Sequence, residues 1–171
     1  MNAVLPESVD AWRMVQGRCA FRGSLPLAAM SRLCDSLAAT SGDVVFDLEF
    51  GKDELGVAQV RVRADASLPL ICQRTMETFA FPVHVDTRLG LISREEDEAN
   101  LPADVEPLLT SNGLLRLADV VEDELILAVP VVPVKPGTTP TRQVWSDDAD
   151  SQEATTDNPF AALAKIKTAN K

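Results

Sequence analysis

The chain has 171 residues, of which 46% are hydrophobic, a formal net charge of −10 and no tyrosine. These values fit one compact domain with a core of aliphatic side chains. The acidic balance argues against a protein that coats nucleic acid by bulk electrostatic attraction, because neutralising phosphates needs a basic surface.

Residues 15–23 alternate between apolar and polar side chains, which predicts a first strand with Arg18 and Arg22 on its outward side. A helix is predicted next. Ser24 suits its N-cap, apolar residues recur at helical spacing, and Gly42 suits its end.

Residues 43–50 and 59–66 show strict alternation, and a polar stretch with two glycines separates them. This pattern predicts a β-hairpin with one buried face and one solvent-exposed face. Arg61 and Arg63 fall on the exposed face of the second strand.

A further strand is predicted over residues 79–91, and Pro82 within it indicates a sheet edge or a bulge. Residues 93–107 are acidic and rich in turn-forming residues, so we expect a loop. Asn112 and Gly113 together predict a tight turn.

The run from Val121 to Pro133 combines acidic residues, an apolar half and two prolines. It predicts a helix that begins with carboxylates near its unpaired backbone amides, and a rigid extended exit. The apolar spacing of Leu117, Val121, Leu125 and Ala128 also predicts a helical face that starts before this run. The carboxylates of this expected first turn belong to Glu122, Asp123 and Glu124.

Beyond Pro133 the composition changes, and residues 134–157 are expected to form an acidic flexible linker. Residues 158–171 predict a short apolar and basic helix, which is too short to be stable alone. It should dock either on a partner or on its own domain. The expected docking residues are Asn158, Pro159, Phe160, Leu163, Lys165 and Lys167.

Together these patterns predict an α+β fold over residues 1–133, with a mostly antiparallel sheet, two main helices and a disordered C-terminal arm. No apolar run approaches the roughly 18 residues that cross a bilayer. The first residues lack the pattern of a signal peptide. We therefore expect a cytoplasmic protein with no membrane partner.

Three stretches resemble the bacterial YceD family (the DUF177 domain): residues 70–74, 121–133 and 158–165. The resemblance implies a non-catalytic factor that supports synthesis, processing or stability of 23S rRNA and biogenesis of the large ribosomal subunit. The implied partner is 23S rRNA or the pre-50S particle, or a basic ribosomal protein, and not DNA. The motif positions are Cys72, Gln73, Arg74, Glu122, Asp123, Glu124, Pro130 and Pro133.

The residues do not predict a metal site, a cofactor or a catalytic centre. In many members of the resembled family a Cys-x-x-Cys pair stands where this chain has Cys72 and Thr75, and His84 is the one histidine of the sequence. One thiolate and one imidazole do not complete a tetrahedral zinc site. Nothing in the sequence places a base beside a nucleophile.

A set of arginines on predicted outward positions is the candidate surface for RNA or a protein partner. Guanidinium groups bind phosphate bidentately and stack on unpaired bases. The alternative is that they pair across strands with Asp43, Asp47 and Glu49. The candidate residues are Arg18, Arg22, Arg61, Arg63 and Arg74. A second alternative for the whole chain is an acidic chaperone or adaptor that holds a basic ribosomal protein without touching RNA.

Overall fold

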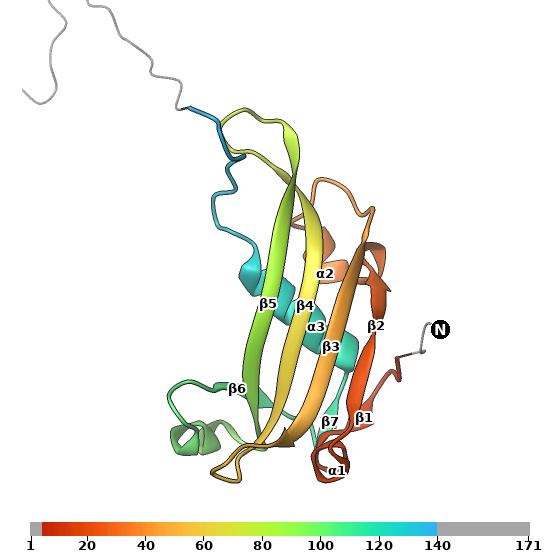
Figure 1. The fold of residues 1–171 in the computed structure, drawn as a ribbon, viewed down its shortest axis with the longest axis vertical. Helices are drawn as coiled ribbons and strands as arrows, with labels where there is room; N and C mark the ends of the chain where they lie inside the picture. The colour runs from red at the N-terminus through yellow and green to blue at the C-terminus, as the bar shows by residue number, and fades with distance from the viewer. Residues whose placement is uncertain (1–4, 140–171) are drawn as a thin grey trace, which may run out of the picture. The chain divides into compact units, whose positions relative to one another are not determined.

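The computed structural model describes residues 5–139. Within them a five-stranded sheet has the order β2-β3-β4-β5-β6, and α3 crosses behind it in Figure 1. All neighbouring strands are antiparallel except β5 and β6. This confirms the predicted α+β fold with a mostly antiparallel sheet. The strands are β2 Ala20–Pro26, β3 Asp43–Lys52, β4 Ala58–Ile71, β5 Thr78–Ile92 and β6 Glu106–Leu109.

The hairpin of β3 and β4 forms as the alternation predicts. Phe46 lies opposite Ala64 and Leu48 lies opposite Val62, and all four side chains are buried on the helix-covered face. The intervening residues point to the other face, which α1, α2 and α3 leave open (Figure 1). The period of two therefore fixes which side chains this open face displays.

A smaller two-stranded sheet joins β1 (Val9–Asp10) to β7 (Leu114–Leu115). The predicted turn before β7 is confirmed, since Asn112 and Gly113 both have positive φ angles, of 53° and 79°. Such angles favour asparagine and glycine.

The first expected strand was wrong over its initial residues. Helix α1 (Ala11–Gly17) occupies this region, because the Asp10 carboxylate accepts the backbone N–H of Arg13 as an N-cap. Arg18 closes the helix in the left-handed conformation, with a φ of 48°, so β2 begins two residues later. Arg18 consequently does not share a strand with Arg22.

The long helix expected from Ser24 was also wrong. Ser24 lies in β2 opposite Val45 of β3, so sheet pairing overrides the local helix signal. Two short helices follow instead, η1 (Leu27–Ala29) and α2 (Ser31–Cys34). The two main helices of the described residues are therefore α1 and α3.

Of the two predicted settings for Pro82, a sheet edge or a bulge, the structure shows the edge. Strand β6 pairs only with Leu89–Ile92, which leaves the rest of this side of β5 unpaired. The Ile92 carbonyl accepts the N–H of Thr110 on the β6 side. Since every second residue of a strand points its backbone groups the same way, Pro82 faces this free edge.

The segment predicted as a loop, residues 93–107, contains the short helix η2 (Glu95–Asn100) and the first residues of β6. It packs on the open side of β5 at Gly90. A Cβ at Gly90 would lie 2.7 Å from Leu101 Cδ2 and 2.9 Å from Val105 Cγ1. The missing side chain therefore makes room for this segment.

Helix α3 (Leu117–Ala128) is longer than the carboxylate signal suggested. It begins after Arg116, five residues before Glu122, because Leu117 already belongs to the buried apolar face. The expectation that Glu122, Asp123 and Glu124 form its first turn was therefore wrong. Among the described residues, no helix is long and apolar enough to span a bilayer.

Candidate functional site

The open face of the sheet carries a row of cross-strand ion pairs. Arg22 Nε lies 2.9 Å from Asp47 Oδ2, and Arg22 Nη2 lies 3.1 Å from Glu49 Oε1. Arg63 Nη2 reaches the same two carboxylates, at 3.2 Å and 2.7 Å. Two carboxylates of β3 thus stand between an arginine of β2 and an arginine of β4.

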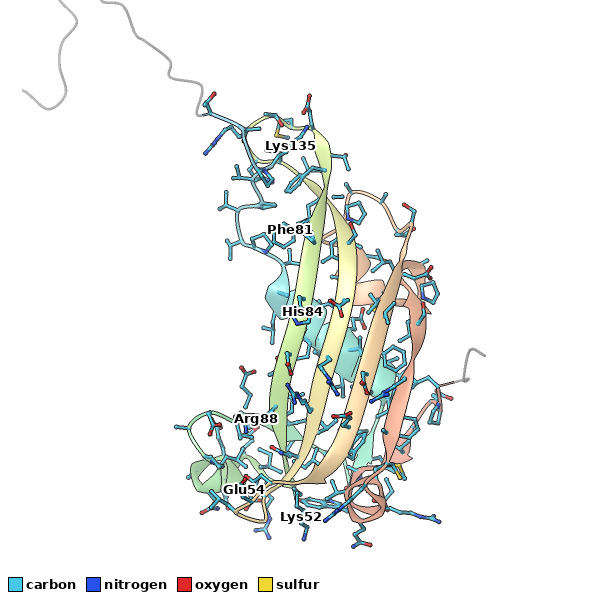
Figure 2. The ribbon with its side chains drawn as sticks, in the orientation of Figure 1. Lys52, Glu54, Phe81, His84, Arg88 and Lys135 are labelled. Atoms are coloured by element: carbon cyan, nitrogen blue, oxygen red, sulfur yellow. The ribbon has the colours of Figure 1, made fainter. Side chains whose placement is uncertain are left out.

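The row continues onto β5, where Arg61 pairs in a bidentate way with Asp86. The two contacts measure 2.7 Å from Nε and 2.6 Å from Nη2. The guanidinium of Arg61 lowers the pKa of the Asp86 carboxyl. Arg88 pairs with Asp104, and Figure 2 shows the position of Arg88 on this face.

These contacts correspond to the alternative of cross-strand pairing, with two differences from the expected partners. Arg61 binds Asp86 of β5 rather than a carboxylate of β3, and Asp43 makes no ion pair among the described residues. Whether these arginines also contact RNA or a protein remains a prediction.

His84 also lies on the open face, where its Nδ1 is 2.7 Å from Asp65 Oδ1 (Figure 2). Both side chains are exposed. Within residues 5–139, no group of three or more His, Cys, Asp or Glu side chains is placed to hold a metal ion.

Two stretches of the resembled motif meet at the turn between β4 and β5. The N–H of Gln73 donates to the carbonyl of Pro133 at 2.9 Å, and Arg74 donates to the carbonyl of Thr138. Lys135 Nζ lies 3.3 Å from Glu77 Oε2. Contacts with the domain therefore continue past Pro133. The predicted boundaries of the domain and the linker remain predictions.

Cys72 lies fully buried at the base of this turn. The backbone N–H of Lys135 points at its Sγ from 3.3 Å. Hydrogen bonds from this amide and from the Thr75 side chain lower the pKa of the thiol to about 6. Backbone amides can stabilise a thiolate in this way, but burial withholds it from solvent.

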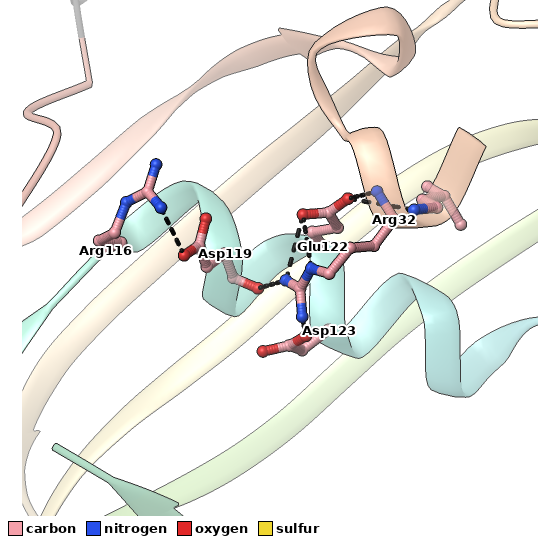
Figure 3. A network of polar contacts seen from close by, with 6 residues as sticks. Arg32, Arg116, Asp119, Glu122 and Asp123 are labelled. Carbon is pink, nitrogen blue, oxygen red and sulfur yellow. Dashed lines mark hydrogen bonds and ion pairs between the residues drawn. The ribbon is translucent and has the colours of Figure 1, made fainter. Parts of the chain in front are cut away.

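Glu122, buried in the middle of α3, supports a different helix. Its Oε1 accepts the backbone N–H groups of Arg32, at 2.7 Å, and of Leu33, at 3.1 Å. Its Oε2 lies 3.1 Å from Arg32 Nη2, and Asp123 also binds this guanidinium (Figure 3). Glu122 therefore satisfies unpaired amides at the start of α2. Sequence reasoning missed this role.

Glu124 is the other buried carboxylate of α3. Burial raises its pKa, and a hydrogen bond with the Thr87 side chain of β5 partly offsets that rise. The motif glutamates thus act inside the domain, between α3 and its neighbours. The C-terminal docking residues, Asn158 to Lys167, lie outside the described residues.

In fold, the described part is an α+β protein with one open, ion-paired sheet face. The sequence model of the family described as "Large ribosomal RNA subunit accumulation protein YceD" matches residues 60–167. The chain belongs to this YceD family, which confirms the resemblance found in its motifs.

A curated relative from Haemophilus influenzae, named Large ribosomal RNA subunit accumulation protein YceD, is 27% identical over 168 residues. The alignment covers 95% of this chain and 96% of that protein. No solved structure matches the chain.

Proposed function

We propose that this chain supports the accumulation of 23S rRNA, and hence biogenesis of the large ribosomal subunit, by binding and not by catalysis. Its direct contact would be rRNA or a ribosomal protein of the pre-50S particle, in the cytoplasm and without a cofactor. The observation that carries the proposal is the similarity along nearly the whole length to a relative named for this role.

The geometry of the described residues is consistent with a binding role. The charged side chains of the open face, such as Arg63 and Asp47, pair with each other across the strands of the sheet. Cys72 and Glu124, whose pKa values are shifted, are buried and do not line a cleft. Catalysis of hydrolysis or transfer usually needs reactive groups that converge on a substrate pocket.

The charge balance favours one specific alternative, an acidic chaperone or adaptor for a basic ribosomal protein. The net charge is −10, and the arginines of the open face already have carboxylate partners. Attraction between opposite charges would speed the encounter with a basic protein and would weaken with salt.

Crosslinking in cells, followed by identification of the attached molecules, tests the proposal. We expect 23S rRNA or ribosomal proteins of pre-50S particles among the crosslinked molecules, and slower 23S accumulation in a strain without the protein. The chaperone alternative predicts a salt-sensitive complex with one basic protein and no RNA. Normal maturation of pre-50S particles in the null strain would contradict the proposal.

Deletion of residues 157–171 tests the predicted docking segment. We expect the shortened chain to fold with unchanged thermal stability but to co-sediment less with pre-50S particles. A matched variant with Lys165→Gln and Lys167→Gln asks whether charge alone is responsible. Full retention on the particles after the deletion would contradict a role for this segment as a ligand.

A further inference from the structure

The arginines and lysines of the described residues differ in whether they have a carboxylate partner. Those of the open sheet face are all engaged in ion pairs. Arg13, Arg18 and Lys52 are exposed and make no ion pair with any other residue in the range 5–139. A cation without an internal partner keeps its charge available for an anionic ligand.

The fold brings these three cations to the same end of the sheet. Arg13 lies on α1, and Arg18 caps the C-terminus of that helix. The next residue, Cys19, accepts the backbone N–H of Phe50 at 2.9 Å, two residues before Lys52 on β3. Figure 2 shows Lys52 at the end of the sheet where Figure 1 shows α1.

An aromatic ring accompanies the cations on α1. Trp12 keeps 37% of its surface exposed. Its ring lies against the turn before β7, since a Cβ at Gly113 would be 3.4 Å from Trp12 Cδ1. The backbone N–H of Ala11 bonds the carbonyl of Gly113 at 2.9 Å, which fixes the helix to that turn. The indole is thus a supported and partly open platform.

Two carboxylates at this end of the sheet accept hydrogen bonds from backbone amides. Asp10 accepts the N–H of Arg13 at 3.0 Å. Asp53 accepts the N–H groups of Leu55, at 2.9 Å, and Val57, at 2.7 Å. These bonds hold the Oδ1 atom of each carboxylate on the backbone. Glu54 is exposed nearby (Figure 2), and its negative charge opposes phosphate binding beside it.

We propose that Trp12, Arg13, Arg18 and Lys52 form a contact surface for single-stranded RNA, which we call the α1 surface. The three cations bind backbone phosphates, and the indole of Trp12 stacks on an unpaired base. Cations that follow the backbone and an aromatic platform are the two parts of single-strand recognition. This inference rests on the rRNA contact in the proposed function and moves it from the open sheet face to α1.

The first test compares two triple variants of the full chain that lose the same charge. One replaces Arg13, Arg18 and Lys52 by glutamine, and the control replaces Arg22, Arg61 and Arg63 by glutamine. Binding of a fluorescein-labelled single-stranded RNA is measured against salt concentration. The α1 variant should bind more weakly, and its log–log salt slope should fall by about 2, for three phosphate contacts. The control should keep the wild-type slope.

The second test isolates the stacking contact. Trp12 and Trp145 are the two tryptophans of the chain, so Trp145→Phe leaves Trp12 as the single tryptophan emitter. Titration with RNA should quench its fluorescence. Trp12→Leu should weaken RNA binding about tenfold, with thermal unfolding recorded to confirm that the variant is folded.

The outcomes separate this inference from the proposed function. If the α1 variant binds RNA as the wild type does, or if both triple variants lose affinity equally, the α1 surface is refuted while a role in 23S accumulation can still stand. If the wild type binds a basic ribosomal protein and no RNA, the α1 surface is refuted and the chaperone alternative gains. Unchanged Trp12 fluorescence on RNA binding would refute the stacking contact.

Discussion

The two faces of the sheet use carboxylates in opposite ways. On the helix-covered face, Glu122 is buried and binds two backbone amides of α2, and Glu124 is buried against β5 with a raised pKa. On the open face, Asp86 is exposed to water and its pKa is lowered by Arg61. A carboxylate that accepts buried backbone N–H groups, as Glu122 does, should therefore contribute more to stability than one in an exposed ion pair, such as Asp86.

The variant Glu122→Ala tests this difference between the two faces most strongly. The variant leaves two backbone N–H groups unpaired, that of Leu33 in a buried place and that of Arg32 in a partly buried one. We expect the free energy of unfolding to fall by roughly 3 kcal/mol, measured by urea denaturation. Asp123→Ala is the matched control on the same helix, since Asp123 binds only the exposed side chain of Arg32. Its cost should stay below about 1 kcal/mol, and an equal cost for the two variants would remove the distinction.

A smaller effect is expected at the one glycine of the open face where another segment packs closely. Gly90→Ala places a methyl group against Leu101 and Val105 and should cost about 2 kcal/mol. Gly51→Ala is its control, because both glycines flank Gln59 and a Cβ at Gly51 meets nothing within 4 Å. Thermal unfolding of the two variants measures the difference. A harmless Gly90→Ala would mean that the segment after η2 does not rest on β5.

A pH series compares the two faces directly. The pKa of Glu124 is raised in the folded protein, so its contribution to stability is present below the ordinary value of 4.5 and is lost as pH rises through the folded pKa. Glu124→Gln should therefore raise the thermal midpoint at pH 7 and have less effect as pH falls towards 4.5.

Asp86→Asn should show the opposite trend. The lowered pKa of Asp86 gives a contribution that is present above its ordinary value of 3.8 and is lost as pH falls through the folded pKa. The variant should be less stable than the wild type at neutral pH, and the two should converge in acid. Parallel pH profiles for Glu124→Gln and Asp86→Asn would contradict the difference between the faces.

The smallest effect is expected for Arg61→Gln, which removes a bidentate but exposed pair. The thermal midpoint should remain nearly unchanged at physiological salt. A large loss of stability would show that the ion-paired row holds the strands together, and the open face would then resemble the buried one.

The sheet could be predicted well because its signal is local. The alternation in residues 43–50 and 59–66 predicts both the strands and their buried face. Pro82 indicates the edge. The N-terminal third could not be read in this way. A seven-residue helix such as α1 has too few positions to distinguish its period from that of a strand, and Ser24 joins the sheet only because β3 lies beside it.

The partners of charged residues were predictable where a single pair of strands decides them, and not elsewhere. The pairing of Arg22 and Arg63 with β3 carboxylates follows from facing positions, whereas that of Arg61 with Asp86 needs the register of a third strand. The amide partners of Glu122 are about 90 residues away along the chain. A position in the middle of a helix gives no local signal for such a partner.

The placement of Pro82 has a consequence for behaviour at high concentration. An unpaired strand edge is a template to which strands of other molecules can hydrogen-bond. Repeated addition of strands in this way builds fibres. Pro82 has no amide hydrogen to offer along the open border of β5, so a neighbouring molecule finds the row of donors interrupted there. The longest strand of the described sheet therefore carries its own protection against self-assembly.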